Sequence, residues 1–286
     1  MILVTGAGGK TGKAIVKALA ARGETVRAFV HRDGLVQSVK ALGASEISVG
    51  SLDDADALSR AMIGARAVYH ICPNASPHEV AFARVVVAAA QGAGVRRFVY
   101  HSVLHPQIEA MPHHWEKMRA EELLFATNLD VTILQPTAYM QNILAGWQVI
   151  VEEGIYRVPY PIETRISLVD LDDVAEAAVR VLMEPGHGGA TYELVGTLPL
   201  SQAEVAEVLG RALGRAVRAE AQSIEAWEAR ARAAGMGGYQ RDTLIKMFRW
   251  YARSGLVGNS SVLRWLLGRA PGALDAFAAR AVAGQT

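Results

Sequence analysis

One glycine-rich segment near the N-terminus constrains the fold of this chain more than any other feature. Thr5-Gly6-Ala7-Gly8-Gly9-Lys10-Thr11-Gly12 lies between an apolar run typical of a strand and an amphipathic run typical of a helix. One glycine permits the tight turn, another lets the backbone approach a pyrophosphate, and a third allows close helix–strand packing. The helix N-terminus offers N–H groups and partial positive charge to phosphates. A P-loop is disfavoured because Lys10-Thr11 lacks the preceding G-x-x-x-x-G spacing. The residues predicted to hold a dinucleotide here are Gly6, Gly8, Gly9, Lys10, Thr11 and Gly12.

Short β-branched runs alternate with amphipathic stretches through the first two-thirds of the chain. Continuous apolar strands separated by helices indicate a parallel sheet that is covered on both faces, with right-handed crossovers. We therefore predict an α/β fold with a doubly wound sheet. The expected strands are 2–5, 25–30, 46–49, 67–71, 97–101 and 131–135, and the expected helices include 13–22, 77–91 and 114–126.

The pattern changes in the last third of the chain. Val158-Pro159-Tyr160-Pro161 indicates a turn-rich insertion, and the chain beyond residue 195 is mainly helical in character. We assign residues 1–152, with roughly 166–184, to a nucleotide-binding domain, and residues 185–286, with the insertion 153–165, to a substrate-binding lobe. All five tryptophans lie beyond residue 110. They either fill the core of the smaller lobe or line an apolar or aromatic substrate pocket.

Composition narrows the range of partners. The chain has 286 residues and a formal net charge of +1, so no basic face for nucleic acid is indicated. The single cysteine, Cys72, fits a reducing compartment, and no apolar run is long enough for a bilayer. We expect a cytoplasmic protein, monomeric or homodimeric, that binds neither nucleic acid nor membrane and acts on a small apolar or aromatic substrate.

The end of the second expected strand predicts which nicotinamide nucleotide is preferred. An NAD site usually has an acidic residue there for the ribose 2′-hydroxyl. Here the strand ends in His31-Arg32, and a guanidinium can make bidentate, charge-assisted bonds to a 2′-phosphate. We predict NADP(H) as the cofactor, with Arg32 as a solvated surface charge as the alternative.

Segments spread over nearly the whole chain carry a family resemblance. Gln135 to Asn142 is similar to an R-P-x-x-F-M-x-N stretch, and Val169 to Ala175 to V-D-x-x-D-[IV]-A. Leu200 to Ala206, followed by Leu213-Gly214-Arg215, is similar to an "LS-x-x-E-x-A … LGR" signature. With the N-terminal turn, these motifs resemble the NmrA-like members of the atypical short-chain dehydrogenases/reductases. They are specific for the family but not for a substrate.

The resemblance implies a Rossmann-like nucleotide domain with a smaller, mostly helical C-terminal lobe. By position, Ser51 and Leu52 would meet the adenine end of the cofactor. The residues that would flank the ribose and nicotinamide are Ile71, Cys72, Pro73, Pro136, Thr137 and Tyr139. For Cys72, packing as a small hydrophobe is the alternative.

The resemblance also directs attention to the helix after the fifth expected strand. A Tyr-x-x-x-Lys pair serves proton transfer in the superfamily, and here Lys117 is present while His113 stands at the tyrosine position. Lys117 could bond the nicotinamide ribose, and His113 could donate a proton. Ser102, after the fifth strand, matches the superfamily's hydroxyl position, and Tyr139 is another possible donor.

Three of these four assignments have a structural alternative. Lys117 could form a surface pair with Glu121, four residues later on a helix. His113 and its neighbour His114 could be ordinary exposed residues, and Ser102 could bond backbone at a strand end. We expect no metal site, because the two histidines lack further ligands at helical spacing.

Two functions from different classes remain open. The first is an NADPH-dependent reductase of an apolar conjugated acceptor, such as a quinone, an enone or an aromatic carbonyl, in which the protein supplies orientation and a proton. The second is a redox-sensing binding protein that reads NADP(H) without turnover, which the missing tyrosine favours. A non-redox use of the nucleotide, such as isomerisation, is a third reading.

Overall fold

A computed structural model describes residues 1–284 and divides the chain into two compact units. The first unit comprises residues 1–108, 113–135 and 174–192, and the second comprises 109–112, 136–173 and the chain from 193 onward. The units therefore place residues 136–152 with the later part of the chain. The predicted domain boundaries stay a prediction.

A seven-stranded sheet forms the centre of the fold, with the order β10-β6-β5-β4-β1-β2-β3. The six strands from β3 to β6 pair in parallel, which confirms the predicted α/β class. Because the central strands β1, β4, β5 and β6 are mostly apolar and buried, both faces of the sheet must be covered there. The strands are β1 (Ile2–Val4), β2 (Val26–Val30), β3 (Glu46–Val49), β4 (Ala67–His70), β5 (Arg97–His101), β6 (Asp130–Pro136) and β10 (Thr191–Leu194).

The strand order reverses at β1, which pairs with β2 on one side and with β4 on the other. In open parallel sheets this switch point leaves a crevice at the carboxyl ends of the strands, where ligands bind. The segments that follow β1 and β4 both reach this edge. The fold therefore brings the glycine-rich turn and residues 71–73 together, as their positions in the sequence predict.

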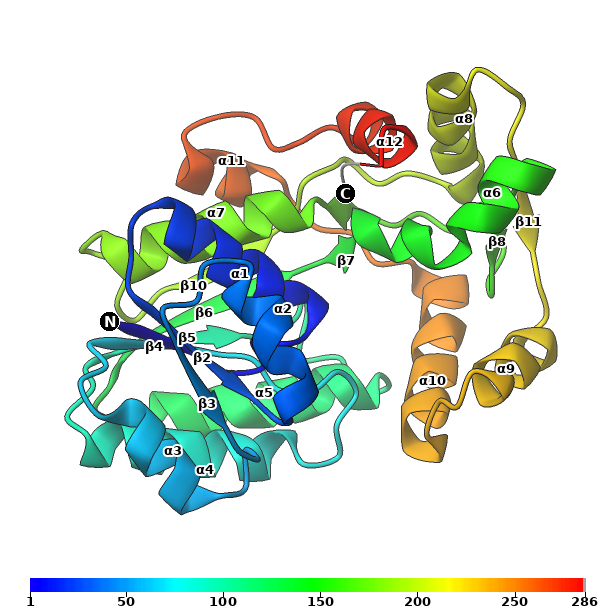
Figure 1. The fold of residues 1–286 in the computed structure, drawn as a ribbon. Helices are drawn as coiled ribbons and strands as arrows, with labels where there is room; N and C mark the ends of the chain where they lie inside the picture. Colours follow the sequence, from blue (N-terminus) through cyan, green and yellow to red (C-terminus); the bar gives the residue numbers. More distant parts are fainter. Residues whose placement is uncertain (285–286) are drawn as a thin grey trace. The chain divides into compact units, whose positions relative to one another are not determined.

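Helices cover the two faces of the sheet in the first unit. In Figure 1, α3, α4 and α5 lie on one face, while α1 and α7 lie on the other. Their bounds are α1 (Lys10–Ala21), the 3₁₀ helix η1 (Asp33–Leu35), α2 (Val36–Lys40), α3 (Ala55–Met62), α4 (Glu79–Gly92), α5 (Pro112–Phe125) and α7 (Leu171–Met183), of which the part from Val174 belongs to this unit.

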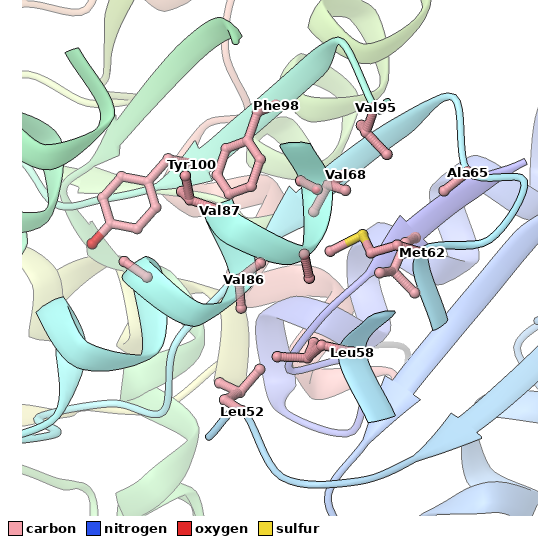
Figure 2. Packing of buried hydrophobic residues seen from close by; sticks show 14 of the residues in the cluster. Leu52, Leu58, Met62, Ala65, Val68, Val86, Val87, Val95, Phe98 and Tyr100 are labelled. Carbon is pink, nitrogen blue, oxygen red and sulfur yellow. The ribbon is translucent and has the colours of Figure 1, made fainter. Parts of the chain in front are cut away.

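A continuous apolar core lies between the sheet and helices α3 to α5. Figure 2 shows Leu58 and Met62 of α3 close to Val86 of α4, beside the strand residues Val68 and Phe98. Burying large side chains such as these contributes about 1.5–3 kcal/mol each. This core fixes α4 and α5 against β4 and β5, and so fixes the polar side chains that these elements carry.

Helix starts in this unit follow capping chemistry. The Asp54 carboxylate accepts a hydrogen bond of 2.9 Å from Ala57 N and caps α3. Helix α1 begins at Lys10, three residues before the predicted start, because Gly9 already has the extended backbone of an N-cap. The glycine-rich turn therefore runs directly into the first helical turn.

The second unit is mainly helical, with two small sheets. Strand β8 pairs in parallel with β11, and β7 pairs in parallel with β9. The insertion predicted to be turn-rich thus contains a strand. The elements are β7 (Ala138–Tyr139), the 3₁₀ helix η2 (Met140–Gly146), α6 (Trp147–Glu153), β8 (Ile155–Val158), β9 (Leu168–Val169), α8 (Gln202–Leu213), β11 (Arg218–Ala221), α9 (Ile224–Ala233), α10 (Gly238–Ser254), α11 (Ser261–Leu267) and α12 (Leu274–Val282).

Candidate functional site

The glycine-rich turn between β1 and α1 has no room for side chains at two of its glycines. Gly6 has a φ of +58°, and a Cβ there would lie 2.8 Å from the carbonyl oxygen of Ile71. A Cβ on Gly12 would overlap the carbonyl oxygen of Gly6 and lie 2.6 Å from Ala7 Cα. By contrast, a Cβ on Gly8 would meet only the flexible side chain of Leu35. The turn and the helix therefore approach each other as closely as backbone atoms allow.

The start of α1 has the chemistry of a phosphate site. Gly9 is the N-cap and brings no side chain to cap the first N–H groups, and the first turn carries no acidic residue. The partial positive charge at such a helix end favours an anion. Partial burial lowers the pKa of Lys10, the first residue of α1. A narrow cradle that a Cβ would fill, next to this helix end, fits the pyrophosphate of a dinucleotide.

Hydrogen bonds tie the turn to the end of β4. Ile71 N donates to Thr5 Oγ1 at 2.9 Å, and the same hydroxyl lies 2.8 Å from His70 Nδ1. Cys72 follows directly and is buried, and burial raises the pKa of its thiol above the ordinary value. This environment agrees with Cys72 as a small packed hydrophobe. Pro73 is exposed at the same strand end.

The residues after β2 and β3 differ in exposure. His31 and Arg32 are both exposed, and Arg32 has an extended backbone that opens η1. Ser51 is exposed after β3, whereas Leu52 is buried in the apolar core. A long, solvated guanidinium can reach a 2′-phosphate without losing a partner in the fold. Contact of these four residues with a nucleotide stays a prediction.

Replacing Arg32 with alanine should weaken the binding of NADPH and leave the binding of NADH unchanged. We expect NADPH binding to weaken by about 10- to 150-fold, because a charge-assisted bond contributes about 1.5–3 kcal/mol. NADH has no 2′-phosphate, so its dissociation constant should not change. Fluorescence titration of both nucleotides measures the ratio, and Arg22→Ala, an exposed arginine at the end of α1, is the matched control. An equal loss for both nucleotides would contradict this role of Arg32.

Lys117 lies in a buried ion pair rather than on the surface. Its Nζ donates to Glu79 Oε1 at 2.9 Å and to the carbonyl oxygen of His101 at 2.8 Å. The ammonium also lies 4.9 Å from the centre of the Tyr100 ring, and the Tyr100 hydroxyl donates to the same Glu79 oxygen at 2.7 Å. The alternative of a surface pair with Glu121 is therefore wrong. Binding of Lys117 to a nicotinamide ribose stays a prediction.

His113 and His114 are both buried near the start of α5, so the alternative of ordinary exposed residues is wrong. Burial, and next the positive charge of Lys117, hold the pKa of His113 well below its usual range. Burial lowers the pKa of His114 to about 4. Both imidazoles are therefore neutral near pH 7, and a neutral imidazole is a weak acid. This environment weakens the hypothesis that His113 donates a proton.

Ser102 follows β5 and is fully buried. Its hydroxyl donates to Glu121 Oε1 in a short hydrogen bond, rather than to backbone as one reading of the sequence suggested. Gln135 Nε2, from β6, lies 3.0 Å from each oxygen of the same carboxylate. Ser102, Glu121 and Gln135 thus form a closed polar cluster beside the Lys117–Glu79 pair.

The remaining predicted residues belong to the second unit. Pro136 ends β6, and Thr137 Oγ1 donates to the carbonyl oxygen of Ser167 at 2.9 Å. Tyr139 is half-buried in β7, which pairs with β9. Placement of these side chains near a nicotinamide stays a prediction.

Aromatic side chains of the second unit pack on one another. The rings of Trp227 and Phe248 lie 4.8 Å apart, and Tyr160 contacts Phe248 and Tyr251 with ring centres 6.1 and 6.0 Å apart. Such edge-on contacts are typical of a small apolar core. Of these four rings, Tyr251 is buried and the others are half-buried, so both readings of the tryptophans stay predictions.

Family segments in the second unit have a structural role. Asp170 forms an ion pair with Arg280 of α12, and Asp173 binds Arg269 at 2.7 Å. Gln141 Nε2 donates to the Asp170 carboxylate at 2.8 Å. These aspartates belong to the V-D-x-x-D stretch, and they fasten the C-terminal segment to the rest of the second unit.

Sequence reasoning missed two residues near Lys117: Glu79, its ion-pair partner, and Tyr100, which donates a hydrogen bond to Glu79. Glu121, expected as a partner of Lys117, instead accepts a hydrogen bond from Ser102. Glu79 is the first residue of α4, and α4 follows the segment that leaves the carboxyl end of β4. This position in the chain is the one sequence signal that places Glu79 near the ligand edge of the sheet. Its partner Lys117 is 38 residues away in the chain, so local spacing gives no sign of the pair.

Residues 1–284 contain neither a candidate metal cluster nor a helix suited to crossing a membrane. Within residues 1–284, no group of three or more His, Cys, Asp or Glu side chains is arranged to hold a metal ion, and the expectation of a metal-free site stays a prediction. None of the helices in that range has the length and apolar character needed to cross a membrane.

The parallel sheet, its switch point and the glycine cradle define a Rossmann-like α/β protein. Residues 1–276 match the model of the NmrA-like family, and the chain belongs to that family. This confirms the family resemblance inferred from the sequence motifs.

Two relatives and one solved structure illustrate the match. An NAD(P)H azoreductase of Xenophilus azovorans is 31% identical over 83% of this chain and 82% of its own length. Quinone oxidoreductase 2 of Escherichia coli is 28% identical over 94% of each chain. The crystal structure of the NADPH-dependent quinone oxidoreductase QOR2 from Escherichia coli, complexed with NADPH, superimposes with a TM-score of 0.85 at 25% identity and covers 99% of this chain and 100% of that chain.

Proposed function

We propose that this chain reduces an apolar conjugated acceptor, such as a quinone, an enone or an aromatic carbonyl, with NADPH. The chain is an NAD(P)H-dependent oxidoreductase that uses NADP(H), because it is similar over nearly its whole length to quinone oxidoreductase 2, whose NADPH complex has the same fold. The observation that carries the proposal is the cradle at Gly6 and Gly12, which fits a dinucleotide phosphate. The acceptor class rests on the names of the relatives, which act on quinones or reduce azo compounds.

The chain's own residues would bind and orient the cofactor, which when bound supplies a hydride. The backbone of the turn would hold the pyrophosphate, and Arg32 would bind the 2′-phosphate. The buried Lys117 ammonium would raise the positive potential where negative charge develops on the acceptor. The other residues proposed to line the cofactor are Lys10, Thr11, His31, Ser51, Leu52, Ile71, Cys72, Pro73, Pro136, Thr137 and Tyr139.

A panel of acceptors tests the proposed reaction. The wild-type protein and NADPH are mixed with 2-methyl-1,4-naphthoquinone, a cyclic enone, an aromatic aldehyde and an aliphatic aldehyde, and the loss of NADPH absorbance is followed. We expect turnover of at least one conjugated acceptor and a much lower rate with the aliphatic aldehyde. The absence of NADPH consumption with every acceptor would overturn the proposal.

A redox sensor without turnover is the second candidate. The observation that favours it is His113 at the position of the superfamily tyrosine, held neutral by burial. A sensor predicts saturable binding of NADPH in the same samples that show no consumption with the panel. The two functions are therefore distinguished by the same experiment.

A further inference from the structure

Gly8 is additional to the regular spacing of the glycine-rich turn. Gly6, Gly9 and Gly12 follow one another at intervals of three residues, and Gly8 lies between two of them. The structure shows what the missing side chain leaves room for. A Cβ on Gly8 would lie 2.6 Å from Cδ1, 3.2 Å from Cγ and 3.4 Å from Cβ of Leu35. The Leu35 side chain therefore packs directly on the backbone of the turn at Gly8.

Leu35 belongs to the segment after β2 that also carries Arg32. Arg32 is the N-cap of η1, and Leu35 is the last residue of η1. The Leu35 N–H donates to the carbonyl oxygen of Arg32 at 3.2 Å. The Ser38 hydroxyl donates to the carbonyl oxygen of Leu35 at 2.8 Å, which ties η1 to α2. A short hydrogen-bonded turn thus connects Arg32 to the side chain that packs on Gly8.

The position of this segment decides which charge it offers to a nucleotide. Arg32 and Asp33 are neighbours of opposite charge, and both are exposed. A segment that is free to turn can present the Asp33 carboxylate, which repels a phosphate, in place of the guanidinium. A loose segment must also be ordered when the ligand binds, and that ordering lowers affinity. Because the pyrophosphate and the 2′-phosphate belong to one ligand, Arg32 is useful only where it is held beside the turn.

We propose that Leu35 is the positioning residue for the preference for NADPH. Packed on Gly8, it holds Arg32 beside the glycine-rich turn, and it acts through Arg32 without touching the nucleotide. This inference rests on the proposed function, in which the turn holds the pyrophosphate and Arg32 binds the 2′-phosphate. It gives the additional glycine of the turn a role, which is to make room for Leu35.

Dissociation constants of NADPH and NADH for variants of Leu35 test this role. In Leu35→Ala we expect NADPH to bind about 10-fold more weakly, the lower end of the loss expected on removing Arg32 itself. NADH has no 2′-phosphate, so its dissociation constant should not change. Leu35→Met conserves the volume and should keep the wild-type ratio of the two constants. Leu35→Val lacks the Cδ1 atom nearest to Gly8 and should fall between alanine and wild type.

The matched control is Leu42→Ala. Leu42 is a half-buried leucine like Leu35, but it precedes β3 and so lies at the edge of the parallel sheet opposite to the turn. We expect this variant to bind both nucleotides as wild type does. Fluorescence titration gives the dissociation constants, and the melting temperature shows that each variant is folded. If Leu35→Ala does not fold, Leu35→Val provides the same comparison with a smaller change.

A double-mutant cycle with Arg32→Ala separates positioning from a general effect on the fold. If Leu35 acts through Arg32, then Leu35→Ala should cause no further loss of NADPH affinity in a protein that already carries Arg32→Ala. A full additional loss of about 10-fold in that background would overturn the role of Leu35. Equal weakening of NADPH and NADH by Leu35→Ala, or an unchanged ratio of the two constants, would also overturn it.

Failure of this inference is distinguishable from failure of the proposed function. A wild-type protein that prefers NADPH, with the same preference in Leu35→Ala, would overturn only the role of Leu35. A wild-type protein that saturates with neither nucleotide, or that binds the two equally, would overturn the proposed NADPH site together with this inference.

Discussion

Replacing Gly12 with alanine is expected to lower NADPH affinity by about 100-fold. The added Cβ overlaps the carbonyl oxygen of Gly6 and comes within 2.6 Å of Ala7 Cα, so the turn or the start of α1 must move. Both neighbours are backbone atoms, which cannot rotate away as a side chain can. Overpacking of this kind costs up to about 3 kcal/mol, and because the displaced turn must return to this strained geometry to bind the phosphates, the same cost lowers affinity by about 100-fold. Equilibrium titration of NADPH fluorescence measures the loss.

The control for Gly12→Ala is Gly92→Ala at the end of α4. A Cβ at Gly92 meets no atom within 4 Å among residues 1–284. This substitution should leave NADPH binding unchanged and stabilise the helix slightly. If Gly12→Ala bound NADPH as tightly as Gly92→Ala, the cradle could not be where the phosphates bind.

Replacing Glu79 with leucine is expected to destabilise the protein by about 3–5 kcal/mol, because it leaves the Lys117 ammonium buried without a counter-ion. In the pair, the side chains of Lys117 and Glu79 are 4% and 0% exposed. Lys117→Met should cost a similar amount by leaving the Glu79 carboxylate unpaired. Urea denaturation gives the free energy of unfolding of each variant.

The double variant Glu79→Leu with Lys117→Met tests whether the stability contributions of the two charges depend on each other. We expect it to be more stable than either single variant, since a buried pair can be replaced by apolar side chains at little net cost. The surface pair of Arg119 and Glu122 on the same helix is the control, and Glu122→Leu should cost less than about 1 kcal/mol. Additive losses in the double variant would show that the two charges do not depend on each other.

Most of the fold could be predicted from the sequence, because the strands of a doubly wound sheet are short, continuous and apolar. The run from Ala67 to Ile71 indicates a buried strand, and β4 occupies Ala67–His70. Helix and strand ends were less predictable, because they depend on single capping groups such as Gly9 and Asp54. The strand β8 was missed because its partner β11 lies some 60 residues later, as in the pair of Ile155 with Arg218.

The glycine turn of the candidate site could be predicted from the sequence, because its requirements are set by local backbone geometry. The buried polar partners of Lys117 and Ser102 could not be predicted in the same way. The need for glycine at Gly6 and Gly12 follows from local turn geometry, and the structure shows the close contacts that require it. The environment of Lys117 depends on Glu79, and that of Ser102 on Glu121 and Gln135. These partners come from separate elements that only the folded sheet brings together, so spacing along the chain does not reveal them.

Titration of the purified wild-type protein with NADPH and with NADH tests most directly whether the glycine cradle and Arg32 form an NADPH site. We predict saturable binding of both nucleotides, with a dissociation constant for NADPH at least about 10-fold lower than that for NADH, as one charge-assisted phosphate contact would give. Failure to saturate with either nucleotide at millimolar concentration, or equal affinity for the two, would contradict this assignment.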